Sequence, residues 1–480
     1  MKKLSRIFAG FIYFLPAVLC FSYFPVISLG FNETMNFELS LPLLWLVSFD
    51  FFAAGILIKL KLWQKLFCKE NLKWILFPVF LTISCFWSLN MLRGILTVGI
   101  LWLIYFAVFA FLKIKPEIVK DRDFRKKFLK NLFAAGIFMA GVLVLQCVLD
   151  LLGVSRDYSL MCAGCVSGMF GFPHPNGFAI EPQFMGNLLL APAIILGAVL
   201  ITACPSDTLR AALAKSSCSL GHIVIKTTPV FFAIVVSAIF LTFSRGAIYA
   251  FGVGMIVLSF FAIRRGVGKK VIKIWGVIVA AFLFSLNLQG IFAQIGPTND
   301  TYYTGVAKVL NHLSLGVIEI RGEGVEDAGA VTEDVVMEGE TTEGDSAEAV
   351  FSGYVAESTE TRTRLSGAAA KIWASDFRTM AFGVGLGGAG TALYLNGESP
   401  APKEIVQNQY MSLLLETGAV GVLLFIYTIC LIFGALRKNV TNEGVVALII
   451  SYMISVLFFA GLPNALHIYL LPGLLISEKT

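Results

Sequence analysis

The stretch 227–263 reads TTPVFFAIVVSAIFLTFSRGAIYAFGVGMIVLSFFAI and contains one charged residue, Arg245. A single helix over this range would measure about 55 Å, whereas the hydrocarbon core of a bilayer is about 30 Å thick. Basic residues stand at both of its ends, at Lys226 and Arg264. The stretch is therefore predicted to form a hairpin of two short membrane-spanning helices that turns at Ser244-Arg245-Gly246.

The composition of the whole chain agrees with this hairpin. Of its 480 residues, 57% are hydrophobic and 14% are charged, and the mean hydropathy is +0.81. Since an average soluble domain is about 25% charged, we exclude an ordinary cytosolic enzyme, a disordered chain and a disulfide mini-protein. The predicted fold class is an all-α polytopic membrane protein.

Apolar runs of the length that crosses a membrane occur about twelve times in the chain. The first run follows Lys2, Lys3 and Arg6 and is predicted to be an uncleaved helix, because no small-residue cleavage site follows it. The predicted spans are 7–30, 40–58, 74–92, 94–112, 131–152, 178–203, 227–243, 246–263, 274–292, 409–435, 444–461 and 463–477.

Lys and Arg concentrate in the even-numbered connections between these spans. Because basic short loops stay in the cytoplasm, both termini are predicted to be cytoplasmic. The remaining chain then divides into spans one to nine (1–292), a large extracytoplasmic loop (293–408) and spans ten to twelve (409–480). The basic connections are 59–73, 113–130, 264–273 and 437–438.

The large loop carries seventeen acidic and seven basic residues, a net charge of −10, so the rest of the chain is at +16. The overall charge of +6 is thus a signal of topology, and no nucleic-acid partner is expected. Within the loop, 322–349 lacks Lys, Arg, Pro and aromatic residues and is predicted to be a disordered insertion. Residues 361–378 show helical spacing and are predicted to form a structured cap.

Three polar groups are candidates for chemistry. Arg245 is either a cation that receives a lipid-linked phosphate or an interfacial anchor that reaches to water. His174 stands between two prolines in the loop before span six, and Glu181 follows at the mouth of that span. A partly buried carboxylate is a natural general base, whereas the alternatives are a solvated histidine and a helix N-terminal acid.

The third group is the glycine-rich turn 383–388 with Gln407, Asn408 and Glu416 at the start of span ten. Intramembrane acids are functional candidates, although for Asp50 a structural hydrogen bond is the favoured interpretation. Cys162 and Cys165 form a C-x-x-C that either closes a disulfide or consists of two small loop residues.

In this order, Ser244-Arg245-Gly246, the long outer loop with Arg362 and Arg364, the turn 383–388 and Glu416-Thr417-Gly418 resemble the O-antigen ligase and polymerase superfamily. The resemblance covers roughly residues 170–435. It implies an inverting, metal-independent glycosyltransferase without a cofactor in the cytoplasmic (inner) membrane. Its partners would be membrane lipid, an undecaprenyl-pyrophosphate-linked oligosaccharide donor and an acceptor glycan.

By this resemblance Arg245 would bind the pyrophosphate, and Glu181 and His174 complete the predicted catalytic set. The ligase pattern has a histidine directly before the asparagine at the start of span ten, whereas this chain has Gln407. A glutamine does not accept a proton at neutral pH. The departure favours a polymerase of surface polysaccharide repeats over a ligase acting on lipid A core. The predicted substrate-binding residues are Arg362, Arg364, Arg378, Gln407, Asn408 and Glu416.

Two further function classes compete with the enzyme. Twelve spans with both ends inside are common in transporters, but such proteins show similar halves, and no internal repeat occurs here. A non-enzymatic receptor or scaffold would use the acidic stretch 322–349 as an interaction tail.

Overall fold

The computed structural model describes residues 2–32, 35–65, 69–119, 124–152, 173–202, 220–296, 301–314, 347–437, 443–459 and 465–475. The possible Cys162–Cys165 pair lies outside these residues. So does most of the stretch predicted to be disordered, since helix α14 begins at Ala347.

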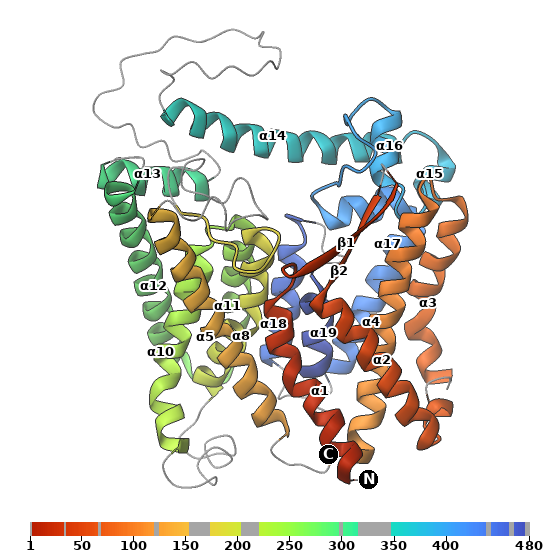
Figure 1. The fold of residues 1–480 in the computed structure, drawn as a ribbon, viewed down its shortest axis with the longest axis horizontal. Coiled ribbons are helices and arrows are strands. Elements are labelled where there is room, and N and C mark those ends of the chain that lie inside the picture. The colour runs from red at the N-terminus through yellow and green to blue at the C-terminus, as the bar shows by residue number, and fades with distance from the viewer. Residues whose placement is uncertain are drawn as a thin grey trace.

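The described chain is a bundle of apolar helices (Figure 1). Eight of the described helices are long and apolar enough to cross a membrane, so the protein is a multi-pass membrane protein. These helices are α1 (Lys2–Cys20), α2 (Leu41–Lys59), α4 (Met91–Ile118), α5 (Phe124–Leu151), α8 (Pro182–Thr202), α11 (Arg245–Arg264), α12 (Gly268–Ile295) and α17 (Gln409–Arg437).

Four shorter apolar helices fall on the remaining predicted spans, and the count of twelve spans stays a prediction. They are α3 (Lys69–Ser84), which continues into the 3₁₀ turn η2 (Cys85–Trp87), α10 (Leu220–Leu241), α18 (Glu443–Ser455) and α19 (Leu466–Leu475). A second 3₁₀ turn, η1 (Trp63–Lys65), follows α2.

The first predicted span, 7–30, is too long. Helix α1 ends at Cys20, and β1 (Val26–Asn32) then pairs antiparallel with β2 (Met35–Ser40), with Val26 opposite Ser40. The alternation of apolar and polar residues in 35–40 suits a strand better than a helix.

Four helices lie at the end of the bundle opposite the start of α1 (Figure 1). They are α13 (Tyr302–Leu313), α14 (Ala347–Trp373), α15 (Phe377–Phe382) and α16 (Ala389–Leu395). Helix α14 lies across this end of the bundle, and the predicted cap 361–378 falls on its second half and on the start of α15.

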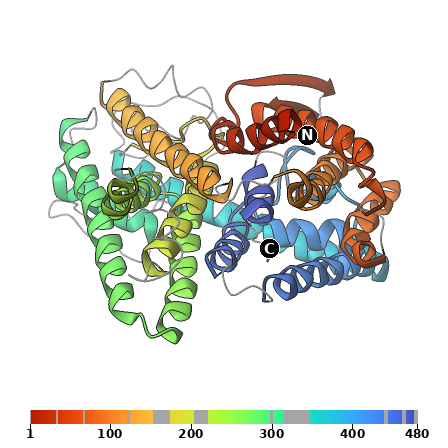
Figure 2. The same ribbon diagram turned by 90° about the horizontal axis from the view of Figure 1, so that it is seen from below.

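Seen from below, the helices form two groups (Figure 2). Helices α5, α8, α10, α11 and α12 pack together. In the other group, α2 packs against α1 and α4, and α3 packs against α4 and α17. Helix α1 also packs against α5 and so joins the two groups. Helices α18 and α19 lie between the groups, since α18 packs against α11 and α8, and α19 packs against α4.

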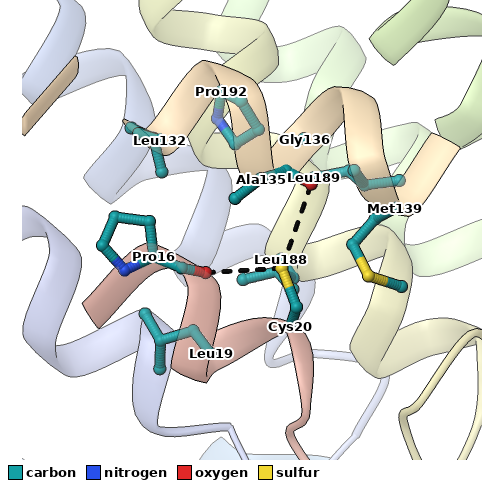
Figure 3. A pocket seen from close by; sticks show the side chains of 10 residues that line it. All are labelled: Pro16, Leu19, Cys20, Leu132, Ala135, Gly136, Met139, Leu188, Leu189 and Pro192. Atoms are coloured by element: carbon teal, nitrogen blue, oxygen red, sulfur yellow. Dashed lines mark hydrogen bonds between the residues drawn. The ribbon is translucent and has the colours of Figure 1, made fainter. Parts of the chain in front are cut away.

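An apolar pocket lies between α1, α5 and α8 (Figure 3). The Cys20 thiol in it lies 3.3 Å from the Pro16 carbonyl oxygen and 3.9 Å from that of Ala135. None of its lining residues is charged, so it offers no group for acid–base or phosphate chemistry. The lining residues are Pro16, Leu19, Cys20, Leu132, Ala135, Gly136, Met139, Leu188, Leu189 and Pro192.

The contact between α11 and α18 depends on a glycine. A Cβ at Gly254 would lie 2.0 Å from the Ser451 hydroxyl oxygen and 2.8 Å from Ile194 Cδ1. The same hydroxyl donates to the Ala250 carbonyl at 2.8 Å, so it does not yield without losing a buried hydrogen bond. Two apolar helices approach closely here because the side chain is absent.

We predict that Gly254→Val lowers the free energy of unfolding by about 2 kcal/mol, because overpacking forces helices apart. The matched control is Gly252→Val in the same helix, where an added Cβ meets nothing within 4 Å. Thermal unfolding of both variants in one detergent checks this. Equal transition temperatures would contradict the close packing of α11 on α18.

Candidate functional site

The turn between α10 and α11 comprises residues 242–244, and Arg245 is the first residue of α11. Phe243 has φ of 43°, a left-handed conformation that costs a non-glycine residue roughly 1–2 kcal/mol. Arg245 is only 8% exposed. A charged side chain and a strained backbone thus occupy the same buried turn.

Neighbouring helices enclose this turn tightly. The Ser244 hydroxyl donates to the Gln183 side-chain oxygen and makes no capping bond to α11. A Cβ at Gly246 would lie 2.6 Å from Gln183 Nε2 and 2.8 Å from Phe458 Cβ. At Gly186 a Cβ would lie 2.5 Å from Ala247 Cβ. The Ser-Arg-Gly sequence is therefore held by α8 on one side and by the end of α18 on the other.

Two histidines lie beside the turn. The rings of His174 and His312 meet edge to face with centroids 5.8 Å apart. His312 Nε2 lies 3.1 Å from the Phe243 carbonyl oxygen, and we assign the proton to Nε2 so that it donates. Both side chains are buried. This contact fixes the carbonyl that immediately precedes Ser244.

Burial and the positive charge of Arg245 keep both histidines neutral. Burial lowers the pKa of His174 from 6.5 to about 4, with Arg245 adding to the effect and the Phe243 backbone opposing it. The pKa of His312 is also lowered well below 6.5, first by burial and then by His174, Arg245 and Arg362. The pair therefore adds no positive charge next to Arg245 at neutral pH.

Glu181 and Arg362 complete the group. Glu181 directly precedes α8, and enclosure by the protein raises its pKa while Arg362 of α14 opposes the rise. Its side chain nevertheless keeps exposed surface, as expected of an acid at a partly enclosed boundary. Arg362 is partly buried and acts on both Glu181 and His312. We call Arg245, His174, His312, Glu181 and Arg362 the Arg245 cluster.

The structure places the other two predicted arginines elsewhere. Arg364 is exposed and donates from Nη1 to the Glu398 carbonyl oxygen at 2.9 Å. Arg378 is exposed on α15. Residues two apart on a helix do not share a face, so Arg362 and Arg364 of α14 point to different neighbours.

Glu416 contacts the glycine-rich turn and not the Arg245 cluster. Its Oε1 accepts from the Ala389 N–H at 3.4 Å, and its carbonyl accepts from the Gly385 N–H at 2.9 Å. Gly383 and Gly418 have φ of 70° and 64°, and a Cβ on either would lie within 2.5 Å of the facing backbone. The turn and the start of α17 interlock, and the part that Glu416 plays here is structural.

Asn408 and Gln407 precede α17. The Asn408 side-chain oxygen accepts from the N–H groups of Tyr410 and Met411 at 3.0 and 3.2 Å, which is an N-capping arrangement. Gln407 is partly buried. Gln409, the first residue of α17, donates its N–H to the Val456 carbonyl at 2.9 Å. The start of α17 is thus attached to the same end of α18 that contacts Gly246.

Sequence reasoning missed Gln289 and misjudged Asp50. Gln289 is fully buried in α12, and its amide lies 3.3 Å from the Pro173 carbonyl, beside His174. Its signal was one of two side-chain amides, Asn287 and Gln289, within the apolar span 274–292. The Asp50 carboxylate has no hydrogen-bond partner among the described residues, so the structural hydrogen bond predicted for it is not seen there.

Residues 230–426 match the family model described as O-antigen ligase. This segment is an O-antigen ligase family domain. It contains Arg245, His312 and Arg362, whereas His174 and Glu181 precede it. The resemblance to the O-antigen ligase and polymerase superfamily is thereby confirmed. No curated protein matches the chain.

The match indicates the general character of the segment 230–426. O-antigen ligase family proteins are glycosyltransferase-like enzymes of the membrane that handle glycans and lipid-linked substrates. The chain is therefore a multi-pass membrane protein with a segment similar to a family of polysaccharide biosynthesis.

Glu416→Ala is predicted to lower the free energy of unfolding by about 1–3 kcal/mol, because it removes the acceptor of a buried backbone N–H. Glu416→Gln keeps one carbonyl oxygen at that place and should lose less. Thermal unfolding, together with proteolysis of the segment 377–400, measures both. Equal loss in the two variants would contradict a role for Glu416 as a hydrogen-bond acceptor.

The neutral histidines predict a pH dependence of stability. In the unfolded chain His174 regains the ordinary pKa of 6.5, whereas in the folded protein its pKa is about 4. Between these two pH values the unfolded chain therefore binds more protons than the folded protein. Stability therefore falls as the pH drops through this window. His174→Gln should show a shallower decline of the unfolding temperature between these two pH values. Parallel curves for wild type and variant would show that His174 titrates normally in the folded protein.

Proposed function

We propose that the chain is an inverting glycosyltransferase that joins glycan from an undecaprenyl-pyrophosphate donor to an acceptor glycan at the outer face of the cytoplasmic membrane. Extension of surface polysaccharide repeats is the favoured reaction. The observation that carries the proposal is the buried Arg245 at the N-terminus of α11, with Arg362 acting on the same cluster.

The position of Arg245 at the start of α11 suits an anionic ligand. The N-terminus of a helix carries partial positive charge, which disfavours an arginine there and favours a phosphate. Ser244 makes no side-chain capping bond at this helix end, and its hydroxyl donates to Gln183. The helix end, Arg245 and Arg362 together form the kind of site in which a pyrophosphate leaving group is stabilised as its charge develops.

The reaction assigns each group one part. The acceptor hydroxyl attacks the anomeric carbon from the face opposite the donor phosphate, and the carbon–oxygen bond to the phosphate breaks with inversion. The electron pair of that bond leaves with the pyrophosphate, next to the two arginines. The hydroxyl proton passes to a base, for which the cluster offers Glu181.

The pKa directions favour Glu181 over His174 as that base. A raised pKa makes the Glu181 carboxylate a stronger base, whereas a pKa of about 4 makes His174 a weak one at neutral pH. His174 and His312 instead lie against the Phe243 backbone and position the turn that carries Arg245. They are positioning residues in this proposal.

Polymerase is favoured over ligase by residue type at the start of α17. Gln407 stands where the ligase pattern has a histidine, and Asn408 next to it caps the helix. An amide there does not accept a proton from lipid A core or another acceptor. The acceptor in this proposal is therefore a second lipid-linked glycan whose hydroxyl reaches Glu181.

The activity test compares neighbouring arginines. Arg245→Ala and Arg362→Ala are each predicted to lower the turnover of lipid-linked oligosaccharide by about 100-fold or more, the usual effect of removing a transition-state donor. Arg364→Ala is expected to have little effect, because its guanidinium binds the Glu398 carbonyl. A loss at Arg364 as large as that at Arg362 would contradict the placement of Arg362 in the site.

Product analysis distinguishes the reaction types. Purified protein in lipid, supplied with one lipid-linked oligosaccharide, is expected to yield a ladder of longer lipid-linked chains. A single transfer to a different added acceptor, without a ladder, would indicate a ligase. Uptake or translocation of the lipid-linked compound without any new glycosidic bond would indicate a transporter and refute the proposal.

A further inference from the structure

Helix α15 is short, yet it is firmly held with apolar side chains exposed. None of its residues is buried, and Phe377 is 81% exposed, with Met380 and Phe382 also exposed. Asp376 caps the helix by accepting from the Thr379 N–H at 3.0 Å, and Trp373 Nε1 donates to the Met380 carbonyl at 3.0 Å. These bonds fix the direction in which the exposed side chains are presented.

The exposed side chains of α15 continue an apolar stripe on α3. Leu76, Val79 and Ile83 are exposed at the spacing of one helix face, and Phe86 of η2 follows at 77% exposure. The ring of the next residue, Trp87, meets that of Phe382 edge to face, with ring centroids 6.4 Å apart. The stripe therefore runs from the side of the bundle onto α15.

Helix α15 also has the position of an interfacial element. It packs against α17, one of the helices long and apolar enough to cross a membrane. In Figure 1 it lies at the ends of α3 and α4, on the side of the bundle that carries α13 to α16. Exposed apolar residues on α17 and on α3 have lipid as their natural neighbour in a multi-pass membrane protein.

We propose that α15 is an interfacial anchor that binds the lipid surface on this side of the bilayer through Phe377, Met380 and Phe382. Aromatic side chains concentrate at membrane interfaces, where one part of the ring is apolar and the other meets headgroups. The exposed Arg378 beside Phe377 is able to reach the headgroup phosphates while its stem lies along the apolar surface.

A lipid surface fits these side chains better than a glycan does. Aromatic residues that stack on sugars are accompanied by polar side chains that bind the ring hydroxyls. The uncharged polar side chain of α15 is that of Thr379, and its hydroxyl already donates to Asp376 at 2.6 Å. Met380 adds an aliphatic surface without hydrogen-bonding capacity.

The anchor would hold the segment 361–378 at a defined depth relative to the membrane surface. The chain leaves α15 directly into the turn 383–388, which interlocks with Glu416, and α14 with Arg362 precedes it. An α15 seated in the interface thus ties the segment that carries Arg362 to the membrane surface. The inference concerns lipid contact alone and does not depend on the glycosyltransferase assignment.

The test places a photo-crosslinking residue at three positions of the full-length protein. Phe377, Tyr394 and Leu423 are replaced one at a time by p-benzoylphenylalanine in vesicles of phosphatidylethanolamine and phosphatidylglycerol. Leu423 of α17 is 65% exposed and reports the lipid phase, and Tyr394 of α16 is 47% exposed and lies outside the stripe. Unchanged thermal unfolding shows that each variant is folded.

After irradiation, mass spectrometry should detect a phospholipid adduct at position 377 at about ten times the yield at position 394, because burial of an aromatic side chain in an apolar phase shifts its distribution by at least that factor. The yield at 423 sets the maximum. Similar yields at 377 and 394 would overturn the proposal. So would a glycan adduct, or no adduct, at 377 while 423 reacts with phospholipid.

Discussion

The structure depends on the burial of one charge, that of Arg245, at the turn between two short apolar helices. An ionised group in apolar surroundings is costly unless other groups compensate it, and here the helix N-terminus adds its own positive partial charge. Neutral polar side chains bind the turn that carries this charge. The Gln183 side-chain oxygen accepts a hydrogen bond from the Ser244 hydroxyl, and His312 Nε2 donates to the Phe243 carbonyl. These contacts shape the turn that carries Arg245.

The neutrality of the histidine pair follows from the same charge. Burial lowers the pKa of His174 and His312, and Arg245 contributes to both shifts. The same desolvation acts in the opposite direction on Glu181, whose pKa it raises. One environment therefore suppresses the proton affinity of two imidazoles and increases that of a carboxylate. In the proposed reaction, this separation gives binding of the leaving group to the arginines and proton transfer to Glu181.

A second constraint joins the outer segment to the bundle. The turn 383–388 and the start of α17 meet backbone to backbone, and glycines at positive φ on both sides make the approach possible. Glu416 adds a side-chain acceptor to this interlock. Helix α14, which carries Arg362, packs against α17 and α16 in this region.

The sequence by itself determined the membrane class, the helix at each predicted span, the turn at Ser244-Arg245-Gly246 and the family, because apolar periodicity and short motifs are local properties. It also named Arg245, Glu181 and His174 together. Only the tertiary structure decided that Arg362 acts electrostatically on Glu181 while Arg364 binds the Glu398 carbonyl, since helical spacing separates two faces without identifying their neighbours. It likewise decided that Glu416 binds backbone and that β1 pairs with β2. Such pairings depend on contacts between segments distant in the chain, which no local pattern encodes.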